Sequence, residues 1–491
     1  MPDVLESTHD ADRAARDGQS QEWCARSSSA VHSGRANRCV LVIASRFPPV
    51  ASVGAVRIRK FARYLDEFGW NPVVVTGPVM GGSAGVDEAR SAIDTESLHD
   101  VPWHVPVHRI SDRADQWPAQ LSGWIDDLCG TIGLEHLHAG ERLGWRFERV
   151  HRALAFPDAG SWRIAALVKQ ALRLHRRHRF DAIFSSGMPF SDHLAAMAIQ
   201  TALRKPWIAD FRDPWVEYIH WKQWRSAWGG RLTRWAESIV VHRVARVIAV
   251  NEQMTSRFAE RYDELPNDRF VTIENGYDPA DFEGAGYQTN GERFRLLHAG
   301  SLYDTRRPDA LIDAFQRFIG QTRGSATRVQ LDFAGRVGPH LERISLASRE
   351  LPVRHVGFLP HATALHAMAL ADVNVILLPN IAGSEGDTTA KLYECLGSGR
   401  PILAIVPPNG AAARVLSGHD DVFVCHPDDR AGIADAIRSL YTRWLDGRLS
   451  NQRSARALST VTRRWQTQRL AHCLDEAVLA KKRGLRVESC T

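Results

Sequence analysis

Residues 388–405 (TTAKLYECLGSGRPILAI) contain side chains that could bind an anionic ligand at the start of a helix. Thr388 and Thr389 stand where they would cap that helix, and a Gly-Ser-Gly exit and a buried strand follow it. A helix that begins beside a strand turns its positive dipole end toward a bound anion. Lys391 and Glu394 are three residues apart, so they share one helix face. A cation for phosphate and a carboxylate for ribose hydroxyls suit a nucleoside diphosphate. The alternative is a surface helix with an ordinary ion pair.

Two glycines follow expected strands and precede expected helices. Gly54, in the segment PPVASVGAVR, would let the backbone approach a ligand, and the amides after it would face an anion. The segment lacks the G-x-G-x-x-G dinucleotide fingerprint, and alone it is better explained as an ordinary turn. Gly300 begins a similar arrangement in AGSLYDTRRP, where Arg306 and Arg307 stand before a helix and within reach of a diphosphate. A solvated loop is the alternative there.

A third candidate is the charged segment ADFRDPW, which ends an expected buried strand. Asp210, Arg212 and Asp213 stand in it almost in succession. In open α/β sheets, ligands bind beyond the carboxyl ends of the strands, so charged side chains at this point are candidates for a site. An ion-pair cluster that only caps the strand is an equally good interpretation.

The composition sets limits on the class of protein. A chain of 491 residues, with 44% hydrophobic and 24% charged residues, should fold into two or three domains. Its net charge of +6 suits anionic ligands or an anionic membrane surface but is too small to indicate nucleic acid binding. We expect neither a membrane span nor a secretory leader, because no long apolar stretch is present. The seven scattered cysteines, without a C-x-x-C pair, fit reduced thiols in a cytosolic protein.

Patterns for other chemistries are weak. The metal-binding pattern D-x-D occurs only at Asp10 and Asp12, in an expected disordered tail, and H-E-x-x-H does not occur, so we predict no metal site. Trp221, Trp224 and Trp228 fall at helical spacing among basic residues, as in a helix that lies in a membrane interface. Core packing is the commoner explanation of such a stripe, and the Gly-Gly pair that follows would break the helix.

Alternating strands and helices predict a doubly wound α/β protein in two halves. Near-continuous apolar runs, typical of strands covered on both faces, occur at residues 39–44, 71–76, 180–185, 206–210, 246–250, 270–273, 295–299, 329–334, 373–378, 401–405 and 421–425. Residues 283–292 (EGAGYQTNGE) are the best linker candidate. Residues 78–160 show little periodicity and are interpreted as inserted helices and loops. The expected organisation is a disordered tail at 1–36, one domain at 37–285, a second at 286–451, a C-terminal helix at 452–480 and a tail at 481–491.

Nine segments of the chain, in family order, resemble the family 4 glycosyltransferases of the GT-B fold (group 1 type). They are FPPVASVGAVRIRKFARYLDEFGW, FDAIFSSGMPFSDHLAAMA, WIADFRDPW, RVIAVNEQM, IENGYD, LLHAGSLYDTRRP, LDFAGRVG, HVGFLPH and TTAKLYECLGSGRPILAI. The resemblance implies two Rossmann-like domains that face a cleft, with residues 37–285 on the acceptor side and residues 286–451 binding the nucleotide sugar. It also implies a C-terminal crossover helix, transfer with retention at the anomeric carbon, and no need for a metal.

The resemblance also implies roles for single residues. Arg307 aligns with the family's diphosphate-binding lysine, and Lys391 lies where the helix start contacts the donor. Glu394 aligns with the second glutamate of the E-x7-E pattern, which usually binds ribose. Gly54 matches the loop that approaches the donor phosphates from the first domain.

The chain departs from the family pattern at three positions. The first glutamate of E-x7-E would fall at Gly386, although Glu385 and Asp387 stand on either side of it. Arg212 replaces the cleft histidine of many members. Ser301 stands where many members have a second phosphate-binding arginine.

The prediction is therefore a retaining, metal-independent glycosyltransferase of the hexosyltransferase type, with a nucleotide-diphosphate sugar as co-substrate and no cofactor. The predicted catalytic residues are Arg212, Asp213, Arg307 and Lys391. The predicted donor-binding residues are Gly54, Gly300, Arg307, Thr388, Thr389, Lys391 and Glu394.

We expect a cytoplasmic protein, peripheral at the inner face of the membrane, that acts on a lipid-linked glycan in cell-surface polysaccharide or glycolipid assembly and binds no nucleic acid. Two alternatives remain open: a sugar-nucleotide epimerase or hydrolase of the same fold, and a catalytically silent scaffold in a polysaccharide assembly complex.

Overall fold

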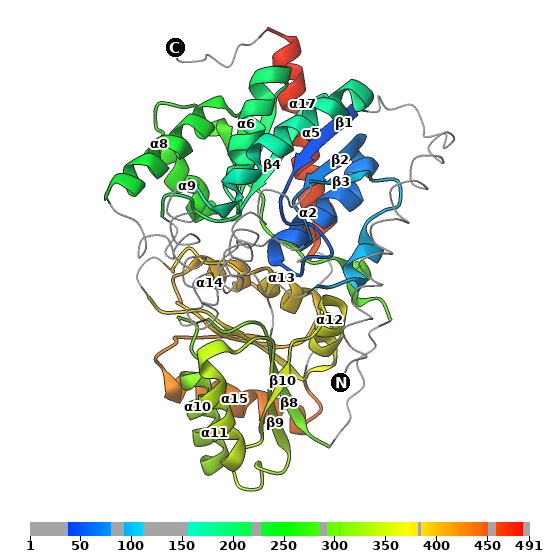
Figure 1. Cartoon of the computed structure of the whole chain (residues 1–491). Helices are drawn as coiled ribbons and strands as arrows, with labels where there is room; N and C mark the ends of the chain where they lie inside the picture. Colours follow the sequence, from blue (N-terminus) through cyan, green and yellow to red (C-terminus); the bar gives the residue numbers. More distant parts are fainter. Residues whose placement is uncertain are drawn as a thin grey trace, which may run out of the picture.

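The computed structural model describes residues 38–79, 93–110, 156–217, 227–284, 292–303, 305–381, 384–419, 421–449 and 458–484. They form two lobes, each built on one parallel sheet with helices against it (Figure 1). The upper lobe of Figure 1 contains the N-terminal strands, and the lower lobe contains the strands from residue 294 onward. The doubly wound α/β fold in two halves, which the alternation of strands and helices predicts, is confirmed.

The sheet of the upper lobe has seven parallel strands in the order β3-β2-β1-β4-β5-β6-β7. Every residue of the central strands β4 and β5 is buried, because helices cover both faces of the sheet. The strands are β1 (Arg38–Ile43), β2 (Trp70–Thr76), β3 (Val107–Arg109), β4 (Ala182–Gly187), β5 (Trp207–Phe211), β6 (Arg246–Ala249) and β7 (Phe270–Thr272). The helices are α2 (Val53–Tyr64), η2 (Leu65–Phe68), η3 (Glu96–Asp100), η6 (Ala159–Arg163), α5 (Ile164–His178), α6 (Ser191–Leu203), α8 (Ala227–Arg243), α9 (Glu252–Arg261), η7 (Asn267–Arg269) and η8 (Pro279–Phe282).

The sheet of the lower lobe has six parallel strands in the order β10-β9-β8-β11-β12-β13. They are β8 (Phe294–Ala299), β9 (Val329–Ala334), β10 (Val353–Gly357), β11 (Val373–Leu377), β12 (Ile402–Ile405) and β13 (Val422–Cys425). The helices are α10 (Asp309–Gln321), η9 (Gly338–His340), α11 (Leu341–Glu350), α12 (His361–Leu370), α13 (Ala390–Gly397), α14 (Ala411–Leu416) and α15 (Arg430–Leu445).

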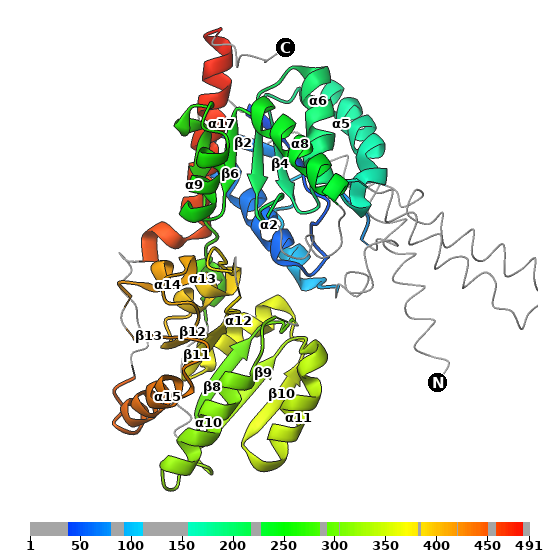
Figure 2. The same ribbon diagram turned by 90° about the vertical axis from the view of Figure 1, so that its left-hand side faces the viewer.

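The two sheets share one strand order, so each has a point where the winding of the chain reverses. In the upper sheet this point lies between β1 and β4, and in the lower sheet between β8 and β11. Ligands of such sheets bind beyond the carboxyl ends of the strands at the point of reversal. Helices α12, α13 and α14 lie at the top of the lower lobe, next to the upper lobe (Figures 1 and 2). The segments that follow the strands of the two lobes are therefore brought together.

The chain crosses between the lobes twice, and the last helix returns to the upper lobe. The two crossing segments bond to each other, since the Tyr277 amide donates to the Val461 carbonyl (3.0 Å) and the Arg463 amide to the Tyr277 carbonyl (2.7 Å). Helix α17 (Arg463–Lys482) then runs along the upper lobe (Figure 2). Its apolar side chains, among them Leu470 and Leu474, are buried against the upper sheet and α2. The lobes are thus joined by a two-stranded connection.

The eleven strands expected from apolar runs are present, but two further strands were not predicted. The additional strands, β3 and β10, are both at the edge of a sheet. The three residues of β3 are only half-buried, and β10 exposes most of its side chains. An edge strand buries little surface, so its sequence carries little hydrophobic pattern.

Several expectations fall outside the described residues. These are the tail at 1–36, most of the segment 78–160, the boundary at residues 285 and 286, and the side chains of Trp221, Trp224 and Trp228. Of the helices described, none combines the length and apolar character that a membrane-spanning segment requires.

Candidate functional site

A cluster of basic side chains surrounds Gly300, at the carboxyl end of β8. A Cβ atom at Gly300 would lie 2.9 Å from Lys391 Nζ and 3.0 Å from His298 Nε2, so both side chains approach the backbone closely at this point. Arg306 belongs to the same cluster, because its charge lowers the pKa of both Lys391 and His298. A side chain at this position would therefore displace the Lys391 ammonium group and press against His298.

Burial sets the protonation states in this cluster. The pKa of Lys391 is lowered to about 8. Burial is the main cause and Arg306 adds to it, whereas Glu394 opposes the shift. Burial and the nearby ammonium group lower the pKa of His298 to about 3, so this imidazole is neutral. Its Nδ1 faces the Val375 carbonyl at 2.9 Å and donates to it. Within the described part of the chain, Nε2 of His298 is buried without a hydrogen-bond partner.

Lys391 and Arg306 present concentrated positive charge. Arg306 is half-buried, and its Nε has no hydrogen-bond partner among the described residues. Its guanidinium lies 5.8 Å from the centre of the Tyr303 ring. Two partly buried cations that repel each other create a site where an anion is stabilised, because an anion relieves their repulsion and replaces their lost hydration.

The structure places Arg307 apart from this cluster, and its predicted contact with the donor stays a prediction. The side chain of Arg307 is 70% exposed, and its Nε donates to Asp309 Oδ2 at 2.9 Å in the first turn of α10. Its neighbour Arg306 is the arginine that lies with Lys391. Successive side chains of a non-helical segment point in different directions, and the sequence does not say which of two adjacent arginines faces inward.

Helix α13 begins beside this cluster and supplies Lys391 and Glu394. Thr389 is the residue at the N-cap, but its hydroxyl makes no capping hydrogen bond, which corrects the expectation of a hydroxyl-capped start. The first amides of a helix have no acceptor within the helix. The amides that follow Thr388 and Thr389 are at the end of α13 that carries Lys391. The helix ends at Gly397, and Gly399 follows with a φ of 72°, a conformation that favours glycine.

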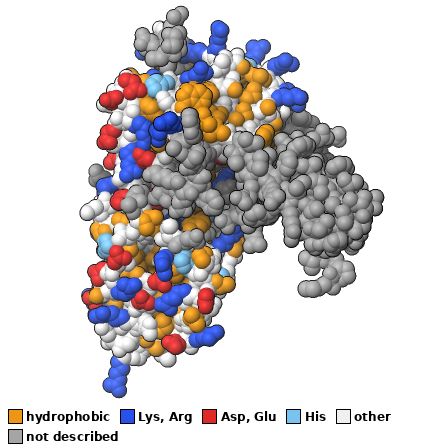
Figure 3. Space-filling view, turned by 60° about the vertical axis from the view of Figure 1, so that its left-hand side comes forward, with side chains coloured by type: hydrophobic (Ala, Val, Ile, Leu, Met, Phe, Trp, Pro, Cys, Tyr) orange, Lys and Arg blue, Asp and Glu red, His pale blue; other side chains and the backbone are white. Residues whose placement is uncertain are grey.

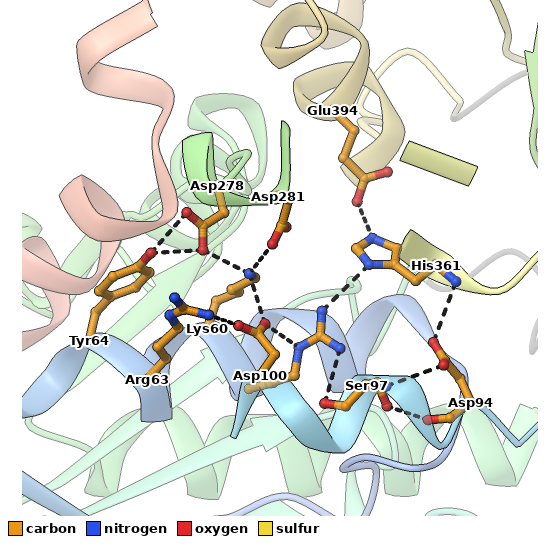
Figure 4. Close-up of polar contacts among 11 residues, drawn as sticks. Lys60, Arg63, Tyr64, Asp94, Ser97, Asp100, Asp278, Asp281, His361 and Glu394 are labelled. Atoms are coloured by element: carbon orange, nitrogen blue, oxygen red, sulfur yellow. Dashed lines mark hydrogen bonds and ion pairs between the residues drawn. The ribbon is translucent and has the colours of Figure 1, made fainter. Parts of the chain in front are cut away.

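Glu394 is a buried and ionised carboxylate on the same helix. Its Oε1 accepts a hydrogen bond from His361 Nε2 at 2.9 Å (Figure 4). Burial alone would raise the pKa of Glu394, but His361, Arg463 and Lys391 outweigh this effect and lower the pKa to about 2. The structure therefore brings Gly300, Arg306, Lys391 and Glu394 together.

The charged residues at the end of β5 have different partners. Asp210 forms a buried bidentate pair with Arg57, whose Nη2 and Nε donate to it at 2.9 and 3.1 Å. Arg212 donates from Nε to the Gly187 carbonyl at 2.8 Å and from Nη2 to the Met188 carbonyl. Asp210 thus has a structural role, as the ion-pair interpretation expects, although its partner lies on α2.

Gly54, at the start of α2, makes room for Arg212. A Cβ atom at Gly54 would lie 1.4 Å from Arg212 Nη1, so the guanidinium occupies the space above this glycine. Burial lowers the pKa of Arg212, and Asp213 and Asp210 oppose this shift. The structure thereby joins two of the predicted residues, Gly54 and Arg212, in one group on the upper lobe.

Asp213 connects the upper-lobe group to the lower lobe. The pKa of Asp387 is raised to about 6. Burial is the main cause and the charge of Asp213 adds to it, whereas Arg306 opposes the shift. Asp387 therefore interacts electrostatically with Asp213 of one lobe and with Arg306 of the other. Gly386 itself is bound through its carbonyl, which accepts a hydrogen bond from Asn251 Nδ2 at 2.8 Å.

Three acidic residues lie close enough to hold a metal ion, but a lysine already occupies their centre. Lys60 Nζ contacts Asp100, Asp278 and Asp281 at 2.7, 2.7 and 2.6 Å (Figure 4). Burial lowers the pKa of Lys60, and the carboxylates oppose this shift. This cluster fastens α2 to η3 and to the first crossing segment, so we interpret it as structural.

Two further residues lie at the site and were not predicted, His298 and His361. Both lie in segments that the resemblance includes, LLHAG and HVGFLPH, but neither segment contains a pattern that assigns chemistry to the histidine. The position of His298 near the carboxyl end of a buried strand could have identified it as a candidate. Nothing in the sequence shows that His361 meets Glu394, because 33 residues separate them.

Comparison with protein families gives two matches. Residues 131–281 match the family described as Glycosyltransferase Family 4, and residues 293–443 match the family described as Glycosyl transferases group 1. Together the two matches cover more than half of the chain. No curated protein sequence matches it.

Solved structures with a similar fold include several enzymes. HepE from Anabaena, determined in complex with UDP-glucose, is 14% identical with a TM-score of 0.51, over 91% of this chain and 99% of that one. The α,α-trehalose 6-phosphate synthase from Burkholderia multivorans is 12% identical with a TM-score of 0.56, over 91% and 100%. A putative UDP-N-acetylglucosamine 2-epimerase from Listeria monocytogenes is 8% identical with a TM-score of 0.50, over 93% and 98%. At these identities the similarity establishes only the fold, which is the two-domain GT-B fold.

Proposed function

We propose that this chain, which belongs to the family 4, group 1 glycosyltransferases, transfers a sugar from a nucleoside-diphosphate sugar to an acceptor with retention at the anomeric carbon. Glycosyltransferase activity follows from the family. The observation that carries the proposal for the donor is the pair of partly buried cations, Lys391 and Arg306, at the start of the helix that also presents the ionised Glu394. HepE, which shares the fold, was crystallised with UDP-glucose, so UDP-sugars are the first donors to test.

Charge on the leaving group explains why cations belong here. As the bond between the sugar and the β-phosphate breaks, negative charge grows on the phosphate oxygen. We propose that Lys391, Arg306 and the amides after Thr388 and Thr389 stabilise this charge without a metal ion, because they are fixed in position before the reaction begins. Glu394 would bind the ribose hydroxyls and would take no part in proton transfer.

The side chains between the lobes are proposed to contact the transferred sugar. Asp387 stands beside the position where the family has a glutamate, and its charge interacts with Arg306 and Asp213. A carboxylate at this point can accept hydrogen bonds from sugar hydroxyls. Arg212 and Asp213 would act from the upper lobe, on the sugar or on the acceptor.

Binding of the donor can be tested by thermal shift with UDP-, GDP- and dTDP-linked sugars. We expect one nucleotide class to raise the melting temperature, since a ligand that binds only the folded protein stabilises it by mass action. The same samples, analysed for released or isomerised sugar without an acceptor, separate a transferase from the epimerase or hydrolase of the same fold. Absence of stabilisation by all donors would refute the proposed donor site. Tight binding without transfer to any acceptor would favour a silent scaffold.

The rate should depend on pH through two groups of the site. Below about pH 6 Asp387 becomes neutral, because its raised pKa lies there, and above about pH 8 Lys391 loses its charge. We therefore expect kcat/KM for the donor, which reports the free enzyme, to follow a bell-shaped profile between these limits. Asp387→Asn should flatten the acidic limb and lower the maximum. A profile that keeps its acidic limb in this variant would show that another group titrates there.

A membrane-bound acceptor is proposed from the exposed side chains of α8. Leu232 and Trp235 are 42% and 60% exposed, and Arg234 beside them is also exposed. Figure 3 shows hydrophobic side chains gathered on one face of the upper lobe, with basic side chains close by. Aromatic and basic side chains together suit the surface of an anionic membrane.

The membrane contact can be measured by pelleting with anionic phospholipid vesicles. Replacing Leu232 and Trp235 with alanine should lower the partition coefficient roughly ten-fold or more, because each side chain would otherwise bury apolar surface in the bilayer. Neutral vesicles serve as the control for the basic residues. Equal recovery of variant and parent protein in the pellet would refute the contact.

A further inference from the structure

His361, the first residue of α12, contacts both the nucleotide-binding helix and the opposite lobe. Its ring Nε2 lies 2.9 Å from Glu394 Oε1 on α13. Its ring Nδ1 lies 3.5 Å from Arg59 Nη2 on α2, and its backbone amide donates to Asp94 Oδ2 at 3.4 Å. Figure 4 shows the histidine between Glu394 and the upper lobe. One side chain thus bridges the two halves of the protein at the site.

When His361 is neutral, the hydrogen bonds that run from Arg59 through His361 to Glu394 have one consistent arrangement. A guanidinium group has no acceptor, so Nδ1 of His361 must accept from Arg59. In the neutral imidazole, the proton then resides on Nε2, which donates to Glu394. The contact with Arg59 therefore selects the tautomer of His361 that donates a hydrogen bond to Glu394. The other carboxylate oxygen, Oε2 of Glu394, is not part of this hydrogen bond.

The upper-lobe end of the chain is rigidly supported. Arg59 is almost fully buried, and its Nε pairs with Asp100 at 2.9 Å. The same carboxylate is held by Lys60, which also binds Asp278 and Asp281 near the first crossing segment. The arginine is thus fixed relative to the connection between the lobes. By contrast, its contact with His361 is at the long end of the hydrogen-bonding range, so it can break at small cost when the lobes move apart.

We propose that His361 is a positioning residue which orients Glu394 for the nucleotide only when the two lobes are in contact, so that nucleotide binding and lobe closure favour each other. The proposal rests on the assignment of Glu394 to the nucleotide site. With the lobes together, Arg59 holds the ring and the ring holds the carboxylate. With the lobes apart, the ring is free to turn, and Glu394 loses the bond that fixes its orientation. Two events that share one contact must affect each other equally, because linkage is reciprocal.

The test is a double-variant cycle in the full chain, with UDP, GDP and dTDP as probes and calorimetry to measure the dissociation constant of the best one. His361→Ala should weaken binding roughly ten-fold to a hundred-fold, the usual effect of losing a hydrogen bond to a charged group. Arg59→Ala should weaken it several-fold, and Arg59→Lys likewise. Lysine keeps a charge beside Asp100 but lacks the forked group that reaches His361.

The decisive result is the absence of additivity. Because Arg59 acts through His361, Arg59→Ala should have no further effect on affinity in the His361→Ala background. Small-angle X-ray scattering should show compaction of the parent protein on adding the nucleotide, and a smaller change in either variant. His366→Ala, an exposed histidine on the same helix, is the matched control and should behave as the parent.

Each other outcome contradicts a defined part of the argument. If Glu394→Ala abolishes nucleotide binding while His361→Ala and Arg59→Lys leave it unchanged, the coupling is refuted and the donor site stands. If the effects of Arg59→Ala and His361→Ala multiply, Arg59 acts independently of the histidine and the proposal fails. If no nucleotide binds the parent protein, the proposed donor site fails and the inference fails with it.

Discussion

Replacing Lys391 with alanine is expected to lower kcat by roughly two to three orders of magnitude while the protein remains folded. The ammonium group lies beside Gly300 and near Arg306, and we propose that it stabilises the charge that develops on the departing diphosphate. A preorganised donor of this kind contributes about 2.7–4 kcal/mol to the transition state. The rate should be measured under donor saturation, with circular dichroism and the melting temperature as checks of folding.

The adjacent arginines provide a matched pair for the same experiment. Arg306→Ala should depress turnover to a similar degree, whereas Arg307→Ala should remain within a few-fold of the parent, because that side chain is exposed and pairs with Asp309. The substitutions are chemically identical and differ only in which way the side chain faces. A stronger loss in Arg307→Ala than in Arg306→Ala would reverse our assignment. Near-normal turnover in both Lys391→Ala and Glu394→Ala would refute the donor site.

Replacing Asp210 with alanine is expected to lower the free energy of unfolding by about 3–5 kcal/mol, because it leaves the Arg57 guanidinium buried without its counter-charge. The two side chains are 1% and 0% exposed, and Ser186 Oγ also donates to Asp210 at 2.7 Å. Water cannot replace the lost carboxylate at so buried a position. Thermal and urea denaturation of the purified variant measure the effect.

An exposed ion pair in the lower lobe serves as the control for this prediction. Asp309→Ala removes the partner of Arg307, which remains in contact with solvent, so the expected cost is about 1 kcal/mol or less. The contrast tests whether burial, rather than the ion pair itself, sets the energetic effect. A variant at Asp210 that is as stable as the one at Asp309 would show that the guanidinium is satisfied by the carbonyls of Ile273 and Glu274 alone.

Asp210 and Arg212 lie in the same segment, ADFRDPW, and both contact the beginning of α2 or its first turns. Asp210 fixes α2 to β5, and this pairing sets the position of the helix start that contains Gly54. Arg212 uses the space above that glycine. The structural pair and the proposed catalytic arginine therefore depend on the same helix.

Patterns within single segments of the sequence predict much of the fold of this protein. Continuous apolar runs predict the buried parallel strands, because strands covered on both faces need apolar side chains at every position, and this pattern lies within single segments. The spacing of Lys391 and Glu394 predicts that they share a helix face, since helical geometry alone sets that relation. The edge strands β3 and β10 escape prediction because they bury little surface.

Contacts between distant segments were decided only by the tertiary structure. The choice between Arg306 and Arg307 depends on how the turn before α10 packs against β8 and α13, and no local pattern distinguishes two adjacent arginines. The meeting of His361 with Glu394 and Arg59 requires three helices from two lobes to come together. Sequence spacing determines which residues share an element, whereas burial and lobe contact determine which side chains meet, because these depend on the folding of the whole chain.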